Sequence, residues 1–238
     1  MGISNINRII VDSLFPSGTT LFPTVKIEDL LKPKTDPSGM YSVLVNKYSY
    51  SWNTTYNPAG KLNGTDYRQY LQIGNQQVKN LVGTIVAPGD TNDQKADKIL
   101  KWVTENITYT LDEAQYHLGE YWAKPTETLK SGKGDCEDGA FLLQSMLLAA
   151  GVPVDRVRTY AGLVKGGSYG LGGHAWTIYK RESDNKWVDL DWCYYPDSTS
   201  VTSKETFKSQ DEYVDAYWWM NAYGTYDEYG KWGINIYA

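Results

Sequence analysis

The sequence contains few residues of the types that bind metals or form cross-links. Among its 238 residues there are two cysteines, Cys136 and Cys193, and two histidines, His117 and His174. Two cysteines cannot make a framework of disulfides, and no CxxC pair is present that would hold structural zinc. We therefore expect no metal site built on cysteine or histidine, and any mechanism that needs an imidazole has two candidates.

Basic clusters and long apolar runs are absent as well. The net charge is -5 and no cluster of Lys or Arg occurs, so we exclude nucleic acid as a partner, because its phosphates require a basic face. No segment reaches the length needed to cross a membrane, and the N-terminus lacks the basic and apolar regions of a secretory signal. We expect a soluble protein, either cytoplasmic or part of a virion or surface assembly, of unknown oligomeric state.

Aromatic residues are abundant instead, with 20 Tyr and 9 Trp. Residues 1–89 are rich in Gly, Pro, Asn and Tyr and show little helical periodicity, which predicts an N-terminal extension packed on the core. Residues 90–238 form the main domain and end in an aromatic-rich segment from Tyr213 to Tyr237. This segment is a candidate surface for binding sugar or protein, although aromatics more often serve packing.

Two helices are predicted in the main domain. Thr91 and Gln94 fit a capping box at the start of an amphipathic helix that runs to about Asn106. A second helix covers residues 136–150, is apolar on most sides and ends at Gly151, so it should be buried at the centre of the domain.

Three strands are predicted after the second helix, at residues 156–164, 174–180 and 187–192. Residues 183–185 have the composition of a hairpin turn between the last two strands. Helices followed by an antiparallel sheet indicate the α+β class, with the buried helix packed on the sheet.

Cys136 lies at the N-terminus of the predicted buried helix. The helix dipole lowers the pKa of a thiol at this position, and the free backbone N–H groups there can donate to an oxyanion. Cys136 is therefore a candidate nucleophile. The alternative is that it is a small buried apolar residue, as most lone cysteines are.

His174 is the candidate base. It follows Gly172 and Gly173, which permit close approach of the backbone, at the start of a predicted strand. The neighbouring antiparallel strand can bring a carboxylate beside its ring, which would complete a triad. Asp189 and Asp191 lie on the same face of that strand, so alternation does not choose between them.

Three motifs together resemble the transglutaminase-like superfamily: Gly-Asp-Cys-Glu-Asp at residues 134–138, Gly-His-Ala-Trp at 173–176 and Trp-Val-Asp-Leu-Asp at 187–191. The resemblance covers about residues 90–195 and implies a papain-like core with a Cys136–His174–Asp191 triad, Asp189 being the fallback acid. The segment at residues 121–129 is similar to the bacterial transglutaminase-like cysteine proteinases. It makes Trp122 a candidate wall or oxyanion neighbour of the site.

The resemblance implies no required cofactor. Some bacterial relatives bind calcium through acidic residues that flank the nucleophile, here Asp135 and Glu137. Two carboxylates alone underfill a calcium shell. Calcium is therefore a hypothesis, which a chelator would test.

Three functions fit these residues. The first is a cysteine peptidase or amidase that hydrolyses an amide bond in a protein or peptide cross-bridge through an acyl-enzyme. The second is transglutaminase-type acyl transfer to an amine, which uses the same triad. The third is a non-catalytic structural or binding module.

Overall fold

The computed structural model describes residues 67–118, 121–165, 171–194 and 199–227. Most of the predicted N-terminal extension, residues 1–66, and the end of the aromatic segment, residues 228–238, lie outside the described residues, and the predicted boundary at residue 90 stays a prediction. The elements run in the order η1 Tyr67–Tyr70, α4 Gln76–Ile85, α5 Asn92–Asn106, β1 Thr108–Tyr109, α6 Asp112–Tyr116, α7 Pro125–Ser131, β2 Lys133–Gly134, α8 Cys136–Ala149, η2 Val154–Arg156, β3 Val157–Lys165, β4 Leu171–Lys180, β5 Trp187–Asp189, η4 Val201–Ser203, η5 Phe207–Ser209, β6 Tyr213–Asn221 and β7 Gly224–Asp227.

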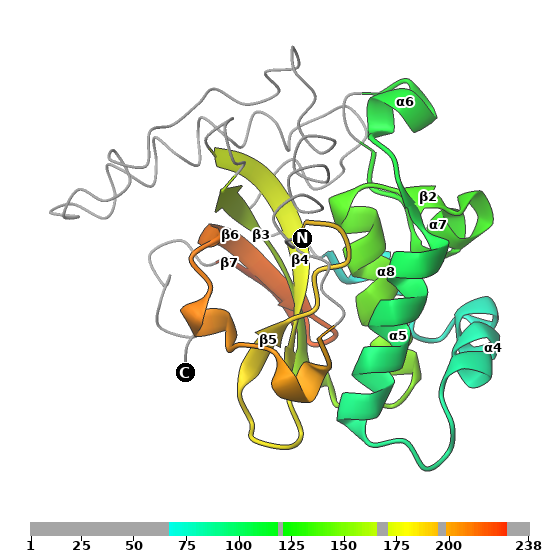
Figure 1. The fold of residues 1–238 in the computed structure, drawn as a ribbon. Helices are drawn as coiled ribbons and strands as arrows, with labels where there is room; N and C mark the ends of the chain where they lie inside the picture. The colour runs from blue at the N-terminus through cyan, green and yellow to red at the C-terminus, as the bar shows by residue number, and fades with distance from the viewer. Residues whose placement is uncertain (1–66, 119–120, 166–170, 195–198, 228–238) are drawn as a thin grey trace, which may run out of the picture.

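The architecture is α+β, with a layer of helices on an antiparallel five-stranded sheet (Figure 1). The strands lie in the order β5-β4-β3-β6-β7, and every pairing in this sheet is antiparallel. The predicted class and the segregation of helices from strands are therefore confirmed. None of the helices in the described part of the chain is long and apolar enough to cross a membrane.

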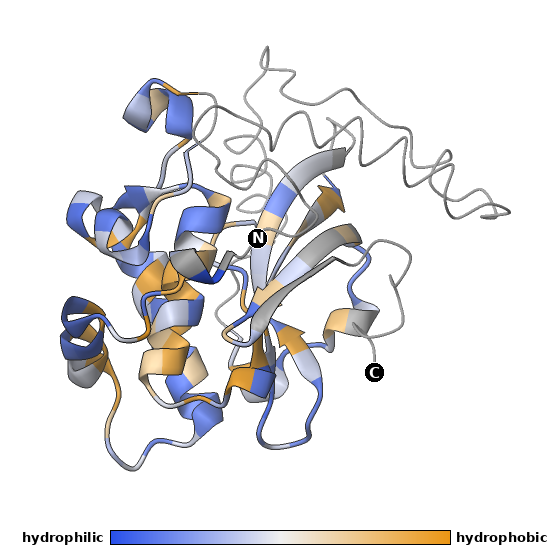
Figure 2. Ribbon diagram, turned by 180° about the vertical axis from the view of Figure 1, so that it is seen from behind, coloured by the Kyte–Doolittle hydropathy of each residue, from blue (hydrophilic) through white to orange (hydrophobic). Residues whose placement is uncertain are grey.

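Both predicted helices are present at the predicted places. The Thr91 side chain accepts from the Gln94 backbone N–H and the Gln94 side chain accepts from the Thr91 N–H, so the capping box of α5 is confirmed. Helix α8 begins at Cys136, and the apolar side chains from Ala140 through Leu148 are buried. Apolar residues concentrate where the helices face one another and the sheet (Figure 2).

The two faces of the sheet differ. Thr159 of β3 donates to the Gln144 side chain of α8 at 2.7 Å, so one face packs on the central helix. The neighbouring residue, Tyr160, points to the other face and stacks on Trp176 of β4. A second, largely aromatic cluster covers that face; its buried members are Tyr160, Val164, Trp176, Ile178, Trp187, Tyr194, Phe207, Tyr213, Ala216 and Trp219.

The prediction for the last strand was too long, since β5 ends at Asp189 and not at residue 192. The chain then turns away because Asp191 accepts hydrogen bonds from its own following backbone, as described below. In the aromatic segment, β6 and β7 extend the sheet, and Tyr213 and Trp219 are buried in its core, whereas Tyr223 is 67% exposed. The rings of Tyr213 and Trp219 therefore pack in the aromatic cluster.

Candidate active site

The start of α8 is shaped by the two residues before Cys136. Gly134 pairs with Tyr109 in the short parallel sheet of β1 and β2, and a Cβ on Gly134 would lie 2.7 Å from the Cβ of Asp138. Only glycine fits there without a shift of the helix. Asp135 then takes an extended conformation as the N-cap, and the helical turn begins at Cys136.

The Cys136 thiol is half-buried and lies among carboxylates. Its Sγ donates a hydrogen bond to Glu137 Oε2 at 3.2 Å, and ligand atoms of Asp135, Cys136 and Glu137 all lie within 4.8 Å of one another. The helix dipole favours a thiolate at this place, but adjacent carboxylates disfavour it. The negative charge of these carboxylates therefore opposes the effect of the helix dipole on the Cys136 thiol.

His174 and Asp191 form a buried pair. His174 Nε2 lies 2.6 Å from Asp191 Oδ2, and the two residues are 3% and 1% exposed. His174 lies on β4, and Leu190 extends the β4–β5 hairpin by donating its N–H to the Thr177 carbonyl at 2.8 Å. The hairpin thus brings the carboxylate of the returning chain beside the imidazole.

Asp191 accepts further hydrogen bonds. Its Oδ1 accepts the backbone N–H groups of Cys193 and Tyr194, each at 3.1 Å, and its Oδ2 also accepts the Tyr213 hydroxyl at 2.9 Å. Burial alone would raise the pKa of Asp191, but the charge and hydrogen bond of His174 and the two backbone donors lower it below its usual value. Asp191 is therefore ionised although it is buried.

Asp189, the other aspartate left open by strand alternation, has different partners. Its carboxylate accepts from Gln210 Nε2 at 2.6 Å and forms a buried ion pair with Lys204 Nζ at 3.2 Å. These contacts join β5 to the segment after it. Geometry thus assigns His174 to Asp191 and gives Asp189 a structural partner.

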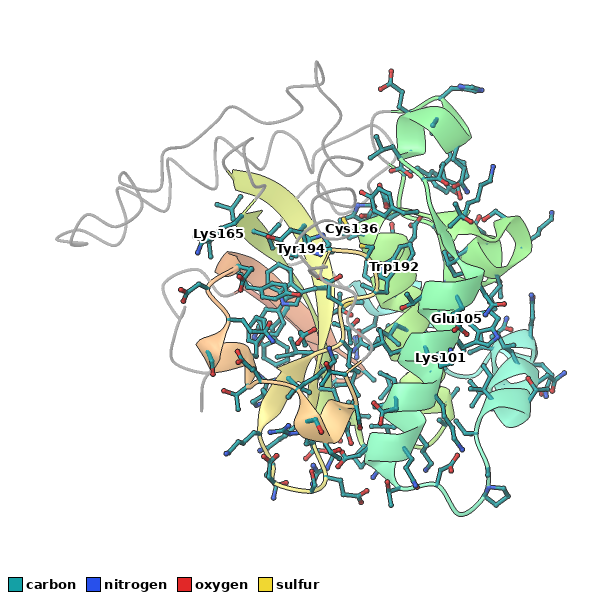
Figure 3. All side chains as sticks on the ribbon, in the orientation of Figure 1. Lys101, Glu105, Cys136, Lys165, Trp192 and Tyr194 are labelled. Carbon is teal, nitrogen blue, oxygen red and sulfur yellow. The ribbon has the colours of Figure 1, made fainter. Side chains whose placement is uncertain are left out.

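Trp192 connects Cys136 with the loop that carries Asp191. Its Nε1 donates to the Cys136 carbonyl at 3.2 Å, and its ring lies so close to Gly139 that a Cβ there would overlap the indole. Figure 3 shows Cys136 and Trp192 together where α8 approaches the sheet. The first turn of α8 is therefore held against the residue that follows the acid.

Trp122 lies in a ring cluster on α8. Its ring is 5.4 Å from that of Tyr70 and 5.5 Å from that of Phe141, and the side chain is buried. The next residue, Ala123, donates its N–H to Asp138 Oδ1 at 2.7 Å. The segment predicted to form a site wall is thus anchored to the first turn of α8, with the Trp122 ring packed on Phe141.

Cys193 is the internal reference for Cys136. It is buried, and burial, followed by the charge of Asp191, raises the pKa of its thiol well above the usual value. The two cysteines of the chain therefore occupy contrasting environments.

A second group of carboxylates lies at the start of α8. Oxygen atoms of Asp112, Asp135 and Asp138 all lie within 4.8 Å of one another, and all three residues are buried. Asp112 Oδ2 accepts the Tyr121 N–H, whereas its Oδ1 is buried and has no hydrogen-bond partner among the described residues. Burial raises the pKa of Asp112 to about 7.

Sequence reasoning missed Tyr213, Trp192, Asp112 and Asp138 as neighbours of the site. Asp138 lies in the same motif as Cys136 and two residues from it, so its presence in the first helical turn was a usable signal. Asp112 and Tyr213 lie 24 residues before and 77 residues after Cys136, and no periodicity connects them with it.

Comparison with known proteins gives one family match and several structural ones. The family model described as the Transglutaminase-like superfamily matches residues 79–192. No curated protein matches the sequence. Three structures of LapG from Legionella pneumophila are similar. The calcium-bound form has 22% sequence identity and a TM-score of 0.48, and the match covers 63% of this chain and 76% of LapG. A second structure has 17% identity, a TM-score of 0.47 and coverages of 66% and 88%, and the EGTA-treated form has 16% identity, a TM-score of 0.48 and coverages of 70% and 94%.

Proposed function

We propose that this chain, whose residues 79–192 match the model of the transglutaminase-like superfamily, is a cysteine peptidase or amidase that cleaves an amide bond in a protein or peptide. Cys136 is the proposed nucleophile, His174 the base and Asp191 the residue that orients the base. The observation that carries the proposal is the buried hydrogen bond between His174 and Asp191, held beside the helix that begins with Cys136.

Because His174 Nε2 is bonded to Asp191, the other ring nitrogen, Nδ1, is left for proton transfer. His174 Nδ1 is then the atom that takes the proton from the Cys136 thiol and later gives it to the leaving amine. For this transfer the thiol moves from Glu137, its acceptor in the structure, toward the imidazole. Asp191 stabilises the imidazolium that results.

The acylation step follows from these positions. The thiolate forms a bond to the carbonyl carbon, and the carbon–nitrogen bond breaks as the leaving amine takes the proton from His174. The backbone N–H groups of the first turn of α8 lie at the positive end of the helix dipole, which suits this turn to stabilise the negative charge on the carbonyl oxygen. Water then attacks the thioester, with His174 as base, and releases the acid.

Hydrolysis and acyl transfer are distinguished by the second nucleophile. We propose to incubate the purified chain with unfolded, carboxymethylated casein and a dansylated alkylamine, and to analyse the products by mass spectrometry. New chain ends support the peptidase, and dansyl groups on glutamine support transfer. Neither product should form with Cys136→Ala, and equal product from wild type and Cys136→Ala would contradict catalysis by Cys136 and favour a non-catalytic module.

We propose further that the carboxylates at the start of α8 hold a calcium ion. Calcium prefers six to eight oxygen ligands, and Asp135 and Glu137 alone do not supply them. The structure brings Asp112 and Asp138 to Asp135, and the buried Asp112 Oδ1 has no hydrogen-bond partner among the described residues. Bound calcium would neutralise carboxylates that disfavour the Cys136 thiolate.

The calcium proposal is tested without an activity assay. Thermal unfolding is followed in EGTA, in calcium and in magnesium. Calcium at 100 times its dissociation constant should stabilise the fold by about 2.7 kcal/mol, and Asp112→Asn should reduce this gain. A melting temperature that is the same in calcium and in EGTA would contradict the site.

A further inference from the structure

We infer that Tyr213 is a positioning residue of the proposed reaction, acting on His174 through the carboxylate of Asp191. The inference rests on the proposed function. Tyr213 lies on β6, in the aromatic segment, outside the three sequence motifs of the site. Its role follows from where its hydroxyl is placed.

The Tyr213 hydroxyl and the His174 ring share one oxygen atom. The hydroxyl donates to Asp191 Oδ2 at 2.9 Å, and His174 Nε2 lies 2.6 Å from the same atom. The other oxygen, Oδ1, is occupied by two backbone N–H groups. Tyr213 is therefore the side chain that competes with His174 for the negative charge on Oδ2.

A bulge in β6 directs Tyr213 to this face. Leu163 of β3 pairs with Asp215, whereas Val164 pairs with Tyr213, so Val214 is the extra residue. Without the bulge Val214 would pair with Val164, and Tyr213 would point to the opposite face of the sheet. The irregular residue thus places the hydroxyl at the carboxylate, as bulges beside active sites often re-aim a side chain.

Packing holds the Tyr213 ring in this position. Its ring centroid lies 5.0 Å from that of Trp176, 4.9 Å from that of Phe207 and 5.9 Å from that of Tyr194. Burial, followed by the charge of Asp191, raises the pKa of Tyr213 well above its usual value, so the hydroxyl stays a donor. Because this donor is rigid and neutral, it reduces by a constant amount the attraction between Asp191 Oδ2 and His174.

Removal of the hydroxyl has a consequence that simple loss of packing does not have. With one donor fewer, Asp191 attracts the imidazolium of His174 more strongly, so the Cys136 thiolate–imidazolium pair persists to higher pH. A residue that served stability alone would lower the melting temperature and leave this pH limit in place.

The experiment measures, in EGTA, the rate of Cys136 carboxymethylation by iodoacetate between pH 4 and 10. The carboxylates at the start of α8, Asp112, Asp135, Glu137 and Asp138, also influence this rate, but they are the same in every variant, so a difference between variants reports on His174 and Asp191. Because the anionic reagent reacts fastest while His174 is protonated beside the thiolate, we expect a bell-shaped profile. In Tyr213→Phe the alkaline limb should move up by about one pH unit, which is the scale of one hydrogen bond to a charged group. Asp191→Asn should move it in the opposite direction.

Tyr179→Phe is the matched control. Tyr179 is also a buried tyrosine, and its hydroxyl donates to a buried carboxylate, Asp93, at 2.7 Å, but five residues beyond His174 on β4. Its removal should lower the melting temperature to a similar extent and leave the profile unchanged. Tyr213→Met is a second variant without the hydroxyl, in which a flexible side chain fills the space if Phe is not tolerated.

The outcomes separate the two claims. A shifted alkaline limb in Tyr213→Phe, with Tyr179→Phe unchanged, supports the role of Tyr213. If wild type, Tyr213→Phe and Tyr213→Met all give the same bell-shaped pH profile, the role of Tyr213 is overturned and the proposed function is unaffected. A wild-type profile with no bell overturns the thiolate–imidazolium pair itself, and with it both claims.

Discussion

The carboxylate of Asp191 and the acidic group at the start of α8, made of Asp112, Asp135 and Asp138, are all buried, but their surroundings affect negative charge in opposite ways. Asp191 accepts four hydrogen bonds from N–H and O–H groups and one from the Cys193 thiol, and its pKa lies below the usual range although the residue is buried. Asp112 receives one described bond to one oxygen, and burial raises its pKa to about 7. The same side chain is thus stabilised as an anion in one place and destabilised in the other.

The difference indicates that the two sites are suited to different roles. A carboxylate with all its donors in place is suited to hold an imidazolium, because its charge is fixed and its orientation is set. A crowded group of carboxylates with an unused oxygen is suited to a cation. Cys136 is joined to the residue after Asp191 through the Trp192 hydrogen bond, and to the acidic group through the first turn of α8.

The largest expected effect comes from a change at Asp191, the carboxylate that has its hydrogen-bond donors in place. Asp191→Asn leaves the shape but removes the charge, so hydrolysis should fall by on the order of 10³-fold or more, as in other triads that lose this carboxylate. Asp189→Asn is the control, since Asp189 pairs with Lys204 and Gln210 instead of His174. It should cost stability and retain most of the rate per folded molecule.

A smaller effect should come from separating the first turn of α8 from Trp192, the residue that follows Asp191. Gly139→Ala places a methyl group against the Trp192 ring and should destabilise the fold by about 1–3 kcal/mol, with a lower rate of Cys136 alkylation. Gly83→Ala is the matched control, because Gly83 lies on the exposed side of α4 with no atom near its Cβ direction. That change should stabilise the protein by up to about 1 kcal/mol.

The third prediction compares the signs of two pH dependences in calcium-free buffer. The pKa of Asp112 is raised, so its contribution to stability is lost as the pH rises from about 4 to 7. Asp112→Asn should therefore be more stable than wild type at pH 8, by on the order of 2 kcal/mol, and similar to it at pH 4.

For Asp191 the sign is reversed. Its pKa is lowered, so it contributes stability above the usual carboxyl pKa of about 4 and loses that contribution as the pH falls through the lowered value. Asp191→Asn should destabilise at pH 7 and have less effect at pH 3. Denaturant unfolding at these pH values checks both variants, and equal pH dependence in the two would contradict the contrast.

Much of this arrangement was predictable because it is local in sequence. The capping box of α5, the start of α8 at Cys136 and the β4–β5 hairpin each depend on residues a few positions apart. The choice between Asp189 and Asp191 was not predictable from alternation, since the strand ends at Asp189 and the chain turns around the Asp191 carboxylate. No pattern in the sequence marks the bulge that presents Tyr213.

The acidic group shows the same limit. The residues flanking Cys136 were predicted as calcium ligands, but the fit depends on Asp112, which a separate helix brings to Asp135. Contacts between distant segments arise from tertiary packing and carry no spacing signal. That part of the calcium hypothesis required the structure.

The central claim is that His174 activates Cys136. The direct measurement is the rate of alkylation of Cys136 and of Cys193 by iodoacetamide as a function of pH, in wild type and in His174→Ala, with mass spectrometry to separate the two sites. We expect Cys136 to react well below the usual thiol pKa of about 8.5, to lose this reactivity in His174→Ala, and to react faster than the buried Cys193 throughout. If Cys136 reacts only at high pH, or at the same rate with and without His174, the proposed catalytic centre is contradicted.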